Sequence, residues 1–339
     1  MRAARYRGDH SITVDDIEST APGAGEVQIE VAYTGICGTD LHILHGSMDS
    51  RVRVPQSIGH EMSGTIAAVG DGVGGFAIGD RVTVMPLSWC GDCPACRAGN
   101  QHICQRLDFV GIDSPGSLQQ LWNVPADILV PLPEGMSLAH AALVEPLAVA
   151  CHDVARSRLV PGETAVVVGG GPIGQLIGIV AARTGARVIL IEPNAERRAL
   201  AARFGAEVVD PIADDPIAYV ESATDGAGAD VVFEVAGVAA TALGSVDHAK
   251  VRGRVVTVAI HAQPVPMNLH RVFWRELELI GARVYERPDF VRAGELLAAG
   301  EVPADDLITR IVPLGDTQLA FDELGAAGAM KILVDVQKG

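Results

Sequence analysis

The hydrophobic pattern divides the chain into two stretches of different periodicity. In the first stretch, short apolar or alternating runs are separated by turns that contain glycine, such as Gly70-Asp71-Gly72. This pattern is typical of β-structure, and it predicts strands at 27–34, 62–69, 80–85 and 127–130. Ser137 is a candidate helix N-cap, and helices are predicted towards Leu143 and over 147–156. The first stretch is therefore rich in strands.

From Thr164 onward, short β-branched runs alternate with amphipathic helical stretches. Strands are predicted at 164–168, 187–191, 229–233 and 253–258, with helices such as 173–184 and 195–204 between them. This alternation indicates parallel βαβ units with helices on both faces of one sheet. The regularity ends near Ile280, and two helices, around 289–299 and 317–324, and a strand at 332–336 follow. Periodicity alone leaves open which stretch this tail joins.

Length and charge narrow the possible classes of protein. At 339 residues the chain is long for a single core, so two domains are expected. The net charge of −16 argues against nucleic acid and anionic membranes as partners. One uncharged run, 165–182, has the length of a membrane span, but Gly169-Gly170-Gly171-Pro172 interrupts it and favours a strand, a turn and a helix. Since the N-terminus lacks an apolar segment of signal-peptide length, we expect a cytoplasmic protein.

Four of the six cysteines fall within one short segment, Cys90-x2-Cys93-x2-Cys96-x7-Cys104. In a reducing compartment such crowding indicates metal binding rather than disulfides. Four thiolates without an open position describe a closed, structural zinc site. Such a zinc can contribute roughly 10–16 kcal/mol to ordering a loop with few apolar residues. Chance clustering and an iron–sulfur centre are the alternatives to this interpretation.

A second group of metal-capable side chains lies upstream of the cysteine segment. Cys37, Thr39, Asp40 and His42 follow a predicted strand, and Gly59-His60-Glu61 comes shortly afterwards. A thiolate and an imidazole suit zinc, and three protein ligands with one open position are typical of a catalytic site. We interpret Cys37 and His60 as ligands of a zinc that receives an alcohol oxygen. Taken alone, each of the two residues is better explained as part of a protein core, as a buried thiol or a hydrogen-bonded histidine.

The third ligand of this site is expected to be an acidic residue. Glu145 interrupts an apolar stretch, where an unpaired buried carboxylate is costly, so a metal or a buried cation is expected beside it. Glu61 is the other candidate oxygen donor. Alternatively, it contacts a metal ligand rather than the metal itself. Asp40 is a candidate acceptor for the ring N–H of His60, and a carboxylate that caps a turn is an equal alternative.

A nucleotide site is predicted where the apolar run 165–168 meets Gly169-Gly170-Gly171-Pro172-Ile173-Gly174. This segment fits G-x-G-x-x-G, in which the first glycine permits a tight turn, the second lets a pyrophosphate approach, and the third lets helix and strand pack closely. The next predicted strand ends at Glu192. Its carboxylate can accept hydrogen bonds from both ribose hydroxyls and would repel a 2′-phosphate, which favours NAD over NADP. Arg197 and Arg198 either weaken this preference or lie on a solvated helix face.

Together these motifs resemble the zinc-dependent medium-chain alcohol dehydrogenases, in the same order and over essentially the whole chain. Glu145, in place of a third cysteine ligand, resembles the polyol and 2,3-butanediol dehydrogenase branch, and threonine dehydrogenases share much of the set. The resemblance implies an α/β fold with a GroES-like β-rich catalytic domain over 1–154, including a structural zinc lobe at 88–106. It further implies a Rossmann domain, a doubly wound parallel sheet, over 155–285, a return of 286–339 to the catalytic domain, and an active site in the cleft.

The resemblance also implies roles for individual residues. It assigns catalytic zinc ligation to four residues: Cys37, His60, Glu145 and, in exchange with water, Glu61. Thr39 becomes the hydroxyl that hydrogen-bonds the substrate oxygen, and His42 the outer end of a proton relay. Lys331 becomes the cation beside the pyrophosphate, with a solvated lysine as the alternative. The expected cofactors are two zinc ions per chain and NAD, and the expected assembly is a tetramer or a dimer.

The predicted reaction is transfer of a hydride between NAD and a secondary alcohol of a diol or sugar polyol, as in 2,3-butanediol and sorbitol dehydrogenases. The alternative is an amino-alcohol dehydrogenase similar to L-threonine 3-dehydrogenase, and a nucleotide sensor without catalysis is a third hypothesis. Phe109 and His261 are candidate pocket residues, with ordinary packing as the alternative. The substrate depends on segments such as 46–55 and 108–120, in which we find no readable motif.

Overall fold

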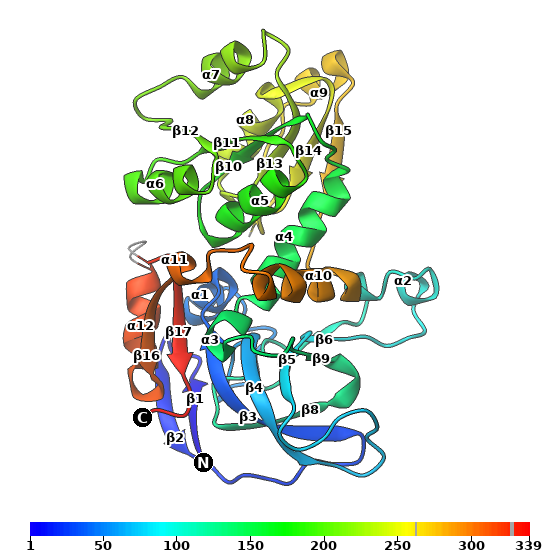
Figure 1. Ribbon diagram of the computed structural model, residues 1–339, viewed down its shortest axis with the longest axis vertical. Helices are drawn as coiled ribbons and strands as arrows, with labels where there is room; N and C mark the ends of the chain where they lie inside the picture. Colours follow the sequence, from blue (N-terminus) through cyan, green and yellow to red (C-terminus); the bar gives the residue numbers. More distant parts are fainter. Residues whose placement is uncertain (262, 326–328) are drawn as a thin grey trace. The chain divides into compact units, whose positions relative to one another are not determined.

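A seven-stranded mixed sheet organises the unit formed by Met1–Glu145 and Glu286–Gly339, here called unit 1. Figure 1 shows the computed structural model, which describes residues 1–261, 263–325 and 329–339. In the central strand, β3 (Glu26–Gly35), Val27, Ile29 and Val31 are fully buried, whereas Gln28 and Glu30 between them are not. Successive side chains of a strand point to opposite faces, so this alternation places one face of β3 on the core.

The strands of unit 1 follow the order β16-β17-β3-β4-β5-β9, with β8 paired to β3. The pair β16 and β17 is parallel and the other pairs are antiparallel. Leu333 in β17 lies opposite Gly35 in β3, and Figure 1 shows the red C-terminal strand beside the blue N-terminal ones. The tail whose place the periodicity left open therefore belongs to unit 1.

The other strands of unit 1 are β1 (Arg2–Tyr6), β2 (Ile12–Asp16), β4 (Glu61–Val69), β5 (Arg81–Val84), β6 (Leu87–Ser88), β7 (Asp108–Phe109), β8 (Leu121–Pro125), β9 (Leu129–Pro131), β16 (Ile308–Pro313) and β17 (Lys331–Asp335). Its helices are α1 (Gly38–Leu44), α2 (Pro94–Arg97), α3 (Leu138–Ala141), α10 (Arg287–Ala298), α11 (Ala304–Leu307) and α12 (Thr317–Gly325), with 3-10 turns at Gln101–Ile103, Ala126–Ile128 and Leu314–Asp316. The strand predicted at 127–130 is thus a 3-10 turn followed by the short strand β9.

The helix predicted over 147–156 starts earlier in the structure. Helix α4 spans Val144–Ser157. Pro146 lies in its first turn, where proline is tolerated because the backbone N–H groups of the first turn make no hydrogen bond within the helix. The contact-based division between the units falls after Glu145, within this first turn, whereas the sequence prediction puts the domain boundary after Val154. Among the described residues, no helix combines the length and the apolar character needed to cross a membrane.

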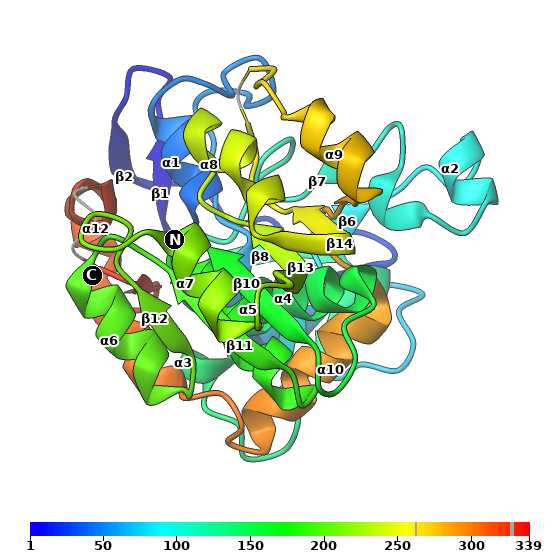
Figure 2. The ribbon, with the colours of Figure 1, turned by 90° about the horizontal axis from the view of Figure 1, so that it is seen from above.

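Unit 2, Pro146–Tyr285, is built on a six-stranded parallel sheet in the order β12-β11-β10-β13-β14-β15. Val166 and Val167 in the central strand are fully buried, as expected for a strand covered on both faces. Figure 2 shows α5 and α6 on one side of this sheet and α8 and α9 on the other. This doubly wound arrangement beside a β-rich unit confirms the predicted α/β fold class.

The strands of unit 2 are β10 (Thr164–Val168), β11 (Arg187–Ile191), β12 (Glu207–Val209), β13 (Ala229–Glu234), β14 (Ala249–Thr257) and β15 (Glu278–Gly281). Its helices, besides α4, are α5 (Pro172–Arg183), α6 (Ala195–Arg203), α7 (Pro216–Ala223), α8 (Ala239–Gly244) and α9 (Leu269–Arg275), with a 3-10 turn at Ser245–Asp247.

Candidate metal and nucleotide sites

The antiparallel pair β3 and β4 brings the first group of metal-capable side chains together. Gly35 near the end of β3 lies opposite Glu61 at the start of β4, so Cys37, just past β3, and His60, just before β4, become neighbours. One possible ligand atom from each of Cys37, His60 and Glu61 lies within 4.8 Å of the others. A Cβ atom on Gly35 would collide with the carboxylate of Glu61, so glycine at this position leaves room for the Glu61 side chain.

The imidazole of His60 is buried, with the residue only 2 % exposed. Its Nδ1 lies 3.4 Å from Oδ1 of Asp40, but the described residues give neither atom an aligned hydrogen bond. Oδ2 of Asp40 accepts the backbone N–H of Cys37 at 2.9 Å. Burial lowers the pKa of His60, but Asp40 and Cys37 outweigh burial and hold this pKa well above its usual value. Asp40 thus both caps α1 and faces the imidazole.

This group fits a divalent cation such as zinc. A thiol, an imidazole and a carboxylate are the ligand types that zinc prefers, and buried polar atoms without partners need an explanation such as an ion. Glu145 is 4 % exposed in the first turn of α4, but it is not one of the three residues whose ligand atoms lie within 4.8 Å of one another. Direct ligation by Glu145 therefore stays a prediction.

Lys331 lies beside this metal-capable group. Its ammonium donates to the two carboxylate oxygens of Glu61, at 2.7 and 2.6 Å, and to the carbonyl oxygen of Ile36 at 3.1 Å. Burial lowers the pKa of Lys331, but the negative charges of Glu61 and Cys37 raise it above its usual value. These bonds use all three N–H donors of the ammonium, and the residue is 3 % exposed. The structure therefore corrects the alternative of a solvated side chain for Lys331, and its contact with a pyrophosphate stays a prediction.

Helix α1 carries Thr39 and His42, the residues of the predicted proton relay. They are three positions apart and so share one face of the helix. Thr39 is half-buried and His42 is exposed. The pair therefore leads from the interior towards solvent, and its role in proton transfer stays a prediction.

The four-cysteine segment forms a second, separate group. The sulfur atoms of Cys90, Cys93, Cys96 and Cys104 lie within 4.8 Å of one another. Three of the separations are 3.4 Å for Cys90 and Cys104, 3.8 Å for Cys93 and Cys104, and 3.9 Å for Cys90 and Cys96. Four sulfurs at about 2.3 Å from one zinc ion, in a tetrahedron, stand about 3.8 Å apart. The segment therefore has the geometry of a closed zinc site.

Backbone N–H groups stabilise negative charge on the sulfur atoms of this segment. The N–H of Cys96 donates to Sγ of Cys93 at 3.4 Å, and the N–H of Arg106 donates to Sγ of Cys104 at 3.3 Å. The backbone N–H groups of Cys96 and Gln105 lower the pKa of Cys93 to about 6. Burial, together with the neighbouring thiols, raises the pKa of Cys96 to about 12. One thiolate therefore forms readily, whereas four in this volume require a cation.

In unit 2 the glycine-rich turn joins β10 to α5. Gly169 has a φ of 106°, which favours glycine, and a Cβ atom there would lie 2.9 Å from the backbone nitrogen of Ala236. A Cβ atom on Gly174 would overlap the carbonyl oxygen of Gly169. Gly171 is the N-cap of α5 with nothing within 4 Å of a Cβ position, and Pro172 and Ile173 open the helix. Open space thus lies before the helix N-terminus, where anions bind.

Glu192 is fixed beside this turn. Its Oε2 accepts the N–H of Gly170 at 2.7 Å, its Oε1 accepts the N–H of Asn194 at 2.8 Å, and the residue is 5 % exposed. The Arg198 guanidinium donates to the carbonyl oxygen of Glu192 at 2.8 Å and pairs with Asp210 at 2.7 Å, so it does not lie on a purely solvated face. Arg197 is half-buried, and its contact with a cofactor stays a prediction.

Sequence reasoning missed Glu234, the last residue of β13. It is 2 % exposed, and its Oε1 accepts the N–H of Gly237 at 2.9 Å and the hydroxyl of Thr241 at 2.7 Å. Its Oε2 lies 3.2 Å from Nε2 of His261, which follows β14. Both residues stand at the carboxyl edge of the parallel sheet, where open α/β sheets bind ligands. The sequence did contain a signal for Glu234, since an acidic residue at the end of an apolar strand is the pattern that identified Glu192.

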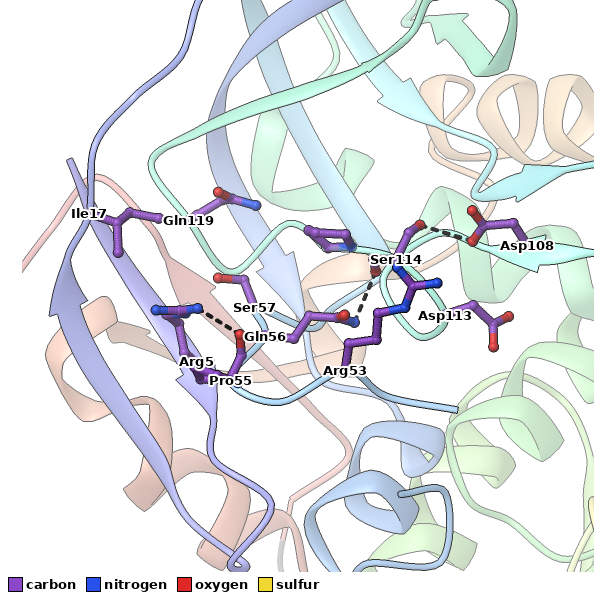
Figure 3. Close-up of a pocket in the computed structure, with 11 residues that line it drawn as sticks. Arg5, Ile17, Arg53, Pro55, Gln56, Ser57, Asp108, Asp113, Ser114 and Gln119 are labelled. Carbon is purple, nitrogen blue, oxygen red and sulfur yellow. Dashed lines mark hydrogen bonds between the residues drawn. The ribbon is translucent and has the colours of Figure 1, made fainter. Parts of the chain in front are cut away.

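Segment 108–119 packs against the first metal-capable group. The ring of Phe109 stands edge-on to the imidazole of His60, with centroids 5.3 Å apart and planes at 87°. The same segment helps to line a pocket of about 580 Å³ in unit 1, together with Arg5, Ile17, Arg53 and residues 55–57. Figure 3 shows the Gln56 amide, which donates to the carbonyl oxygen of Ser114 at 3.1 Å. The predicted zinc ligands do not line this pocket.

Known proteins match nearly the whole chain. Residues 23–134 match the family described as alcohol dehydrogenase GroES-like domain, and residues 172–299 match the family described as zinc-binding dehydrogenase. The chain is 52 % identical to the 2-dehydro-3-deoxy-L-galactonate 5-dehydrogenase of Pseudoalteromonas atlantica, over 99 % of this chain and 98 % of that protein. It is 32 % identical to a sorbitol dehydrogenase of Halalkalibacterium halodurans, over 96 % of each. A crystal structure described as a zinc-binding dehydrogenase of Sinorhizobium meliloti bound to NADP gives a TM-score of 0.93 at 34 % identity, covering 98 % of each chain.

Proposed function

The chain belongs to the zinc-dependent medium-chain alcohol dehydrogenase family, and on this premise we propose that it transfers a hydride between NAD and a secondary hydroxyl of a sugar acid. The predicted resemblance, the GroES-like domain and the class of nicotinamide-dependent dehydrogenase are confirmed. The observation that carries the proposal is the 52 % identity, over 99 % of the chain, to an enzyme named for a sugar acid. A neutral polyol is the second candidate, supported by the 32 % identical sorbitol dehydrogenase.

We place the reacting hydroxyl at the group of Cys37, His60 and Glu61. Zinc bound there supplies Lewis acidity, which lowers the pKa of an alcohol hydroxyl. Cys37 and His60 would hold the metal, with a carboxylate oxygen of Glu61 or Glu145 as the third donor. The supporting observation is the largely buried cluster of a thiol, an imidazole and a carboxylate, with one possible ligand atom of each within 4.8 Å of the others.

Two residues of α1 would move the hydroxyl proton. Thr39 accepts a hydrogen bond from the substrate hydroxyl and passes its own proton outward, and the exposed imidazole of His42 exchanges that proton with solvent. When bound, NAD would accept a hydride from the carbinol carbon, and the alcohol that gives up its hydroxyl proton through Thr39 would become a ketone. The order from half-buried Thr39 to exposed His42 supports this route.

The nucleotide would bind at the glycine-rich turn of unit 2. The space before α5 at Gly171 suits the pyrophosphate, and the fixed carboxylate of Glu192 suits the ribose hydroxyls. A 2′-phosphate would stand beside the negative charge of Glu192, which supports a preference for NAD. Because the Sinorhizobium meliloti relative was solved with NADP, this preference needs its own measurement.

Initial rates with NAD and with NADP test the proposal. The substrates are 2-dehydro-3-deoxy-L-galactonate, sorbitol, 2,3-butanediol and L-threonine, and the zinc content is measured in parallel. We expect the sugar acid with NAD to give the largest kcat/KM, from protein that holds about two zinc ions per chain. A kcat/KM for a neutral polyol that is at least about tenfold higher, a difference near 1.4 kcal/mol, would select the second candidate. Preference for threonine, or no turnover of any substrate, would contradict both candidates.

A further inference from the structure

Segments 46–55 and 108–120, which carry no readable motif, are joined by an ion pair. The Arg51 guanidinium donates from Nε to Oδ1 of Asp113 at 2.8 Å and from Nη2 to Oδ2 at 2.7 Å. Two parallel N–H···O bonds fix the relative orientation of the two groups as well as their distance. The side chains are 37 % and 23 % exposed, and such partly exposed pairs add little to stability. The pair therefore fixes how the two segments are oriented relative to each other and contributes little to stability.

Asp113 also closes the turn that begins at Phe109. Its carboxylate Oδ2 accepts the backbone N–H of Phe109 at 2.9 Å. Its own backbone N–H donates to the carbonyl oxygen of Phe109 at 2.9 Å, and the N–H of Ile112 donates to the same oxygen at 2.9 Å. The oxygen that receives one arm of the Arg51 fork is thus the oxygen that holds the amide of Phe109. A shift of the carboxylate would move the start of the turn.

The same turn sets the position of the Phe109 ring on His60. The ring lies edge-on to the imidazole, with centroids 5.3 Å apart, and both residues are buried. The backbone of the turn is pressed against the segment before His60, because a Cβ atom on Gly111 or on Gly116 would collide with the carbonyl oxygen of Gly59. The turn therefore has little room to move without moving the ring.

We propose that Asp113, held by Arg51, is a positioning residue that fixes Phe109 against the imidazole of His60 and so sets the orientation of this ligand. Segment 46–55 would act on the reaction centre through this contact. The proposal rests on the proposed function only for the role of His60 as a ligand. Arg51 contacts Asp113, Asp113 contacts Phe109, and Phe109 contacts His60. This series of contacts does not depend on which alcohol is oxidised.

The test is an NMR measurement on zinc-loaded protein labelled with ¹³C at the histidine Cε1 position. The His60 signal is identified by its absence in the His60→Gln variant, and Phe109→Leu gives the shift caused by loss of the aromatic ring. Asp113→Ala removes both the fork and the acceptor for the Phe109 amide. Asp113→Asn keeps an acceptor but removes the charge. We expect a large change of the His60 signal in Asp113→Ala and a smaller one in Asp113→Asn.

A matched control comes from a second exposed fork, in unit 2. Arg187 donates from Nε and Nη2 to the two carboxylate oxygens of Glu207 at 2.6 and 2.8 Å. Glu207→Gln should leave the His60 signal and the kinetics unchanged. In contrast, Asp113→Ala should lower kcat/KM for the preferred substrate roughly tenfold, since a displacement of about 1 Å at a reaction centre can cost up to about a hundredfold. The zinc content should not change.

An unchanged His60 signal in Asp113→Ala would overturn the proposal, whether or not Phe109→Leu changes it. If Asp113→Ala does not fold, Asp113→Asn and Arg51→Ala provide the same comparison, and an unchanged signal in both would overturn it equally. If the wild-type protein oxidises none of the tested alcohols, the proposed function fails, but the NMR comparison still decides this proposal.

Discussion

At the scale of single residues, Lys331 and Glu61 form a buried ion pair beside the metal-capable group. Their side chains are 4 % and 1 % exposed, with Nζ and Oε2 2.6 Å apart. In water each charge would be solvated, so inside the protein each depends on the other for compensation. The strand pairing of β17 with β3 brings Lys331 to this place.

Lys331→Met should therefore destabilise the protein by roughly 3–5 kcal/mol, because it leaves the carboxylate of Glu61 buried without its cation. Urea unfolding of protein freed of zinc by a chelator, in which no metal ion compensates Glu61, measures the loss. Lys338→Met is the control, since Lys338 pairs with Asp335 at 3.0 Å but is 76 % exposed, and removal of such a surface pair should cost far less. Equal losses in the two variants would show that burial of the Lys331 pair has no energetic consequence.

His60 should set the pH dependence of metal binding in unit 1. Burial lowers its pKa, but Asp40 and Cys37 raise it well above the usual value overall, so the metal-free imidazole holds its proton more tightly than an ordinary histidine does. This proton must leave before the nitrogen can bind a metal. Because a raised pKa favours the protonated form, and because the Cys37 thiol must also lose its proton to bind zinc, zinc affinity should fall as the pH drops. Competition with a chelator between about pH 6 and about pH 9 tests this, and a higher affinity on acidification would contradict it.

At the scale of elements, helix α5 contains two glycines in different surroundings. A Cβ atom on Gly174 would overlap the carbonyl oxygen of Gly169, whereas a Cβ atom on Gly178 would have Val188 Cγ1 as its nearest neighbour, at 3.8 Å. Gly174 thus allows the helix to pack against the turn. Gly178 has no such steric requirement, and glycine within a helix costs about 0.5–1 kcal/mol relative to alanine.

Gly174→Ala should therefore weaken NADH binding by more than about tenfold, because it moves the turn that receives the pyrophosphate. Gly178→Ala should leave NADH binding unchanged and stabilise the protein by about 0.5–1 kcal/mol. Fluorescence titration with NADH and urea unfolding measure the two effects. The steric account fails if Gly174→Ala binds NADH as tightly as Gly178→Ala does.

Elements were predictable from sequence where their pattern is local. The buried strand β10 and the turn after it were found because an unbroken apolar run meets glycines at fixed spacing. Strand β9 was misplaced, since Ala126–Ile128 folds as a 3-10 turn that periodicity does not distinguish from a strand. Helix α4 begins at Val144 rather than at 147, since the first turn of a helix accepts Pro146.

At the scale of the whole molecule, the family and both groups of metal-capable residues were readable because their spacing is conspicuous in sequence. The contacts that orient them were not readable. Lys331 meets Glu61 across 270 positions, and Arg51 meets Asp113 across 62. Such pairs depend on strand register and turn geometry rather than on any local pattern. A cytoplasmic location, the domain boundary after Val154 and an oligomeric assembly stay predictions.

The central claim is that Cys37 and His60 hold a zinc ion that alcohol oxidation requires. The most direct test is the zinc content and the dehydrogenase rate of Cys37→Ala, with Cys151→Ala, which removes a buried thiol outside both groups, as the control. The account predicts that Cys37→Ala falls from about two zinc ions per chain to about one and loses activity, while Cys151→Ala keeps both zinc ions and its activity. A Cys37→Ala protein that retains both zinc ions, or that oxidises the alcohol at the wild-type rate, would contradict it.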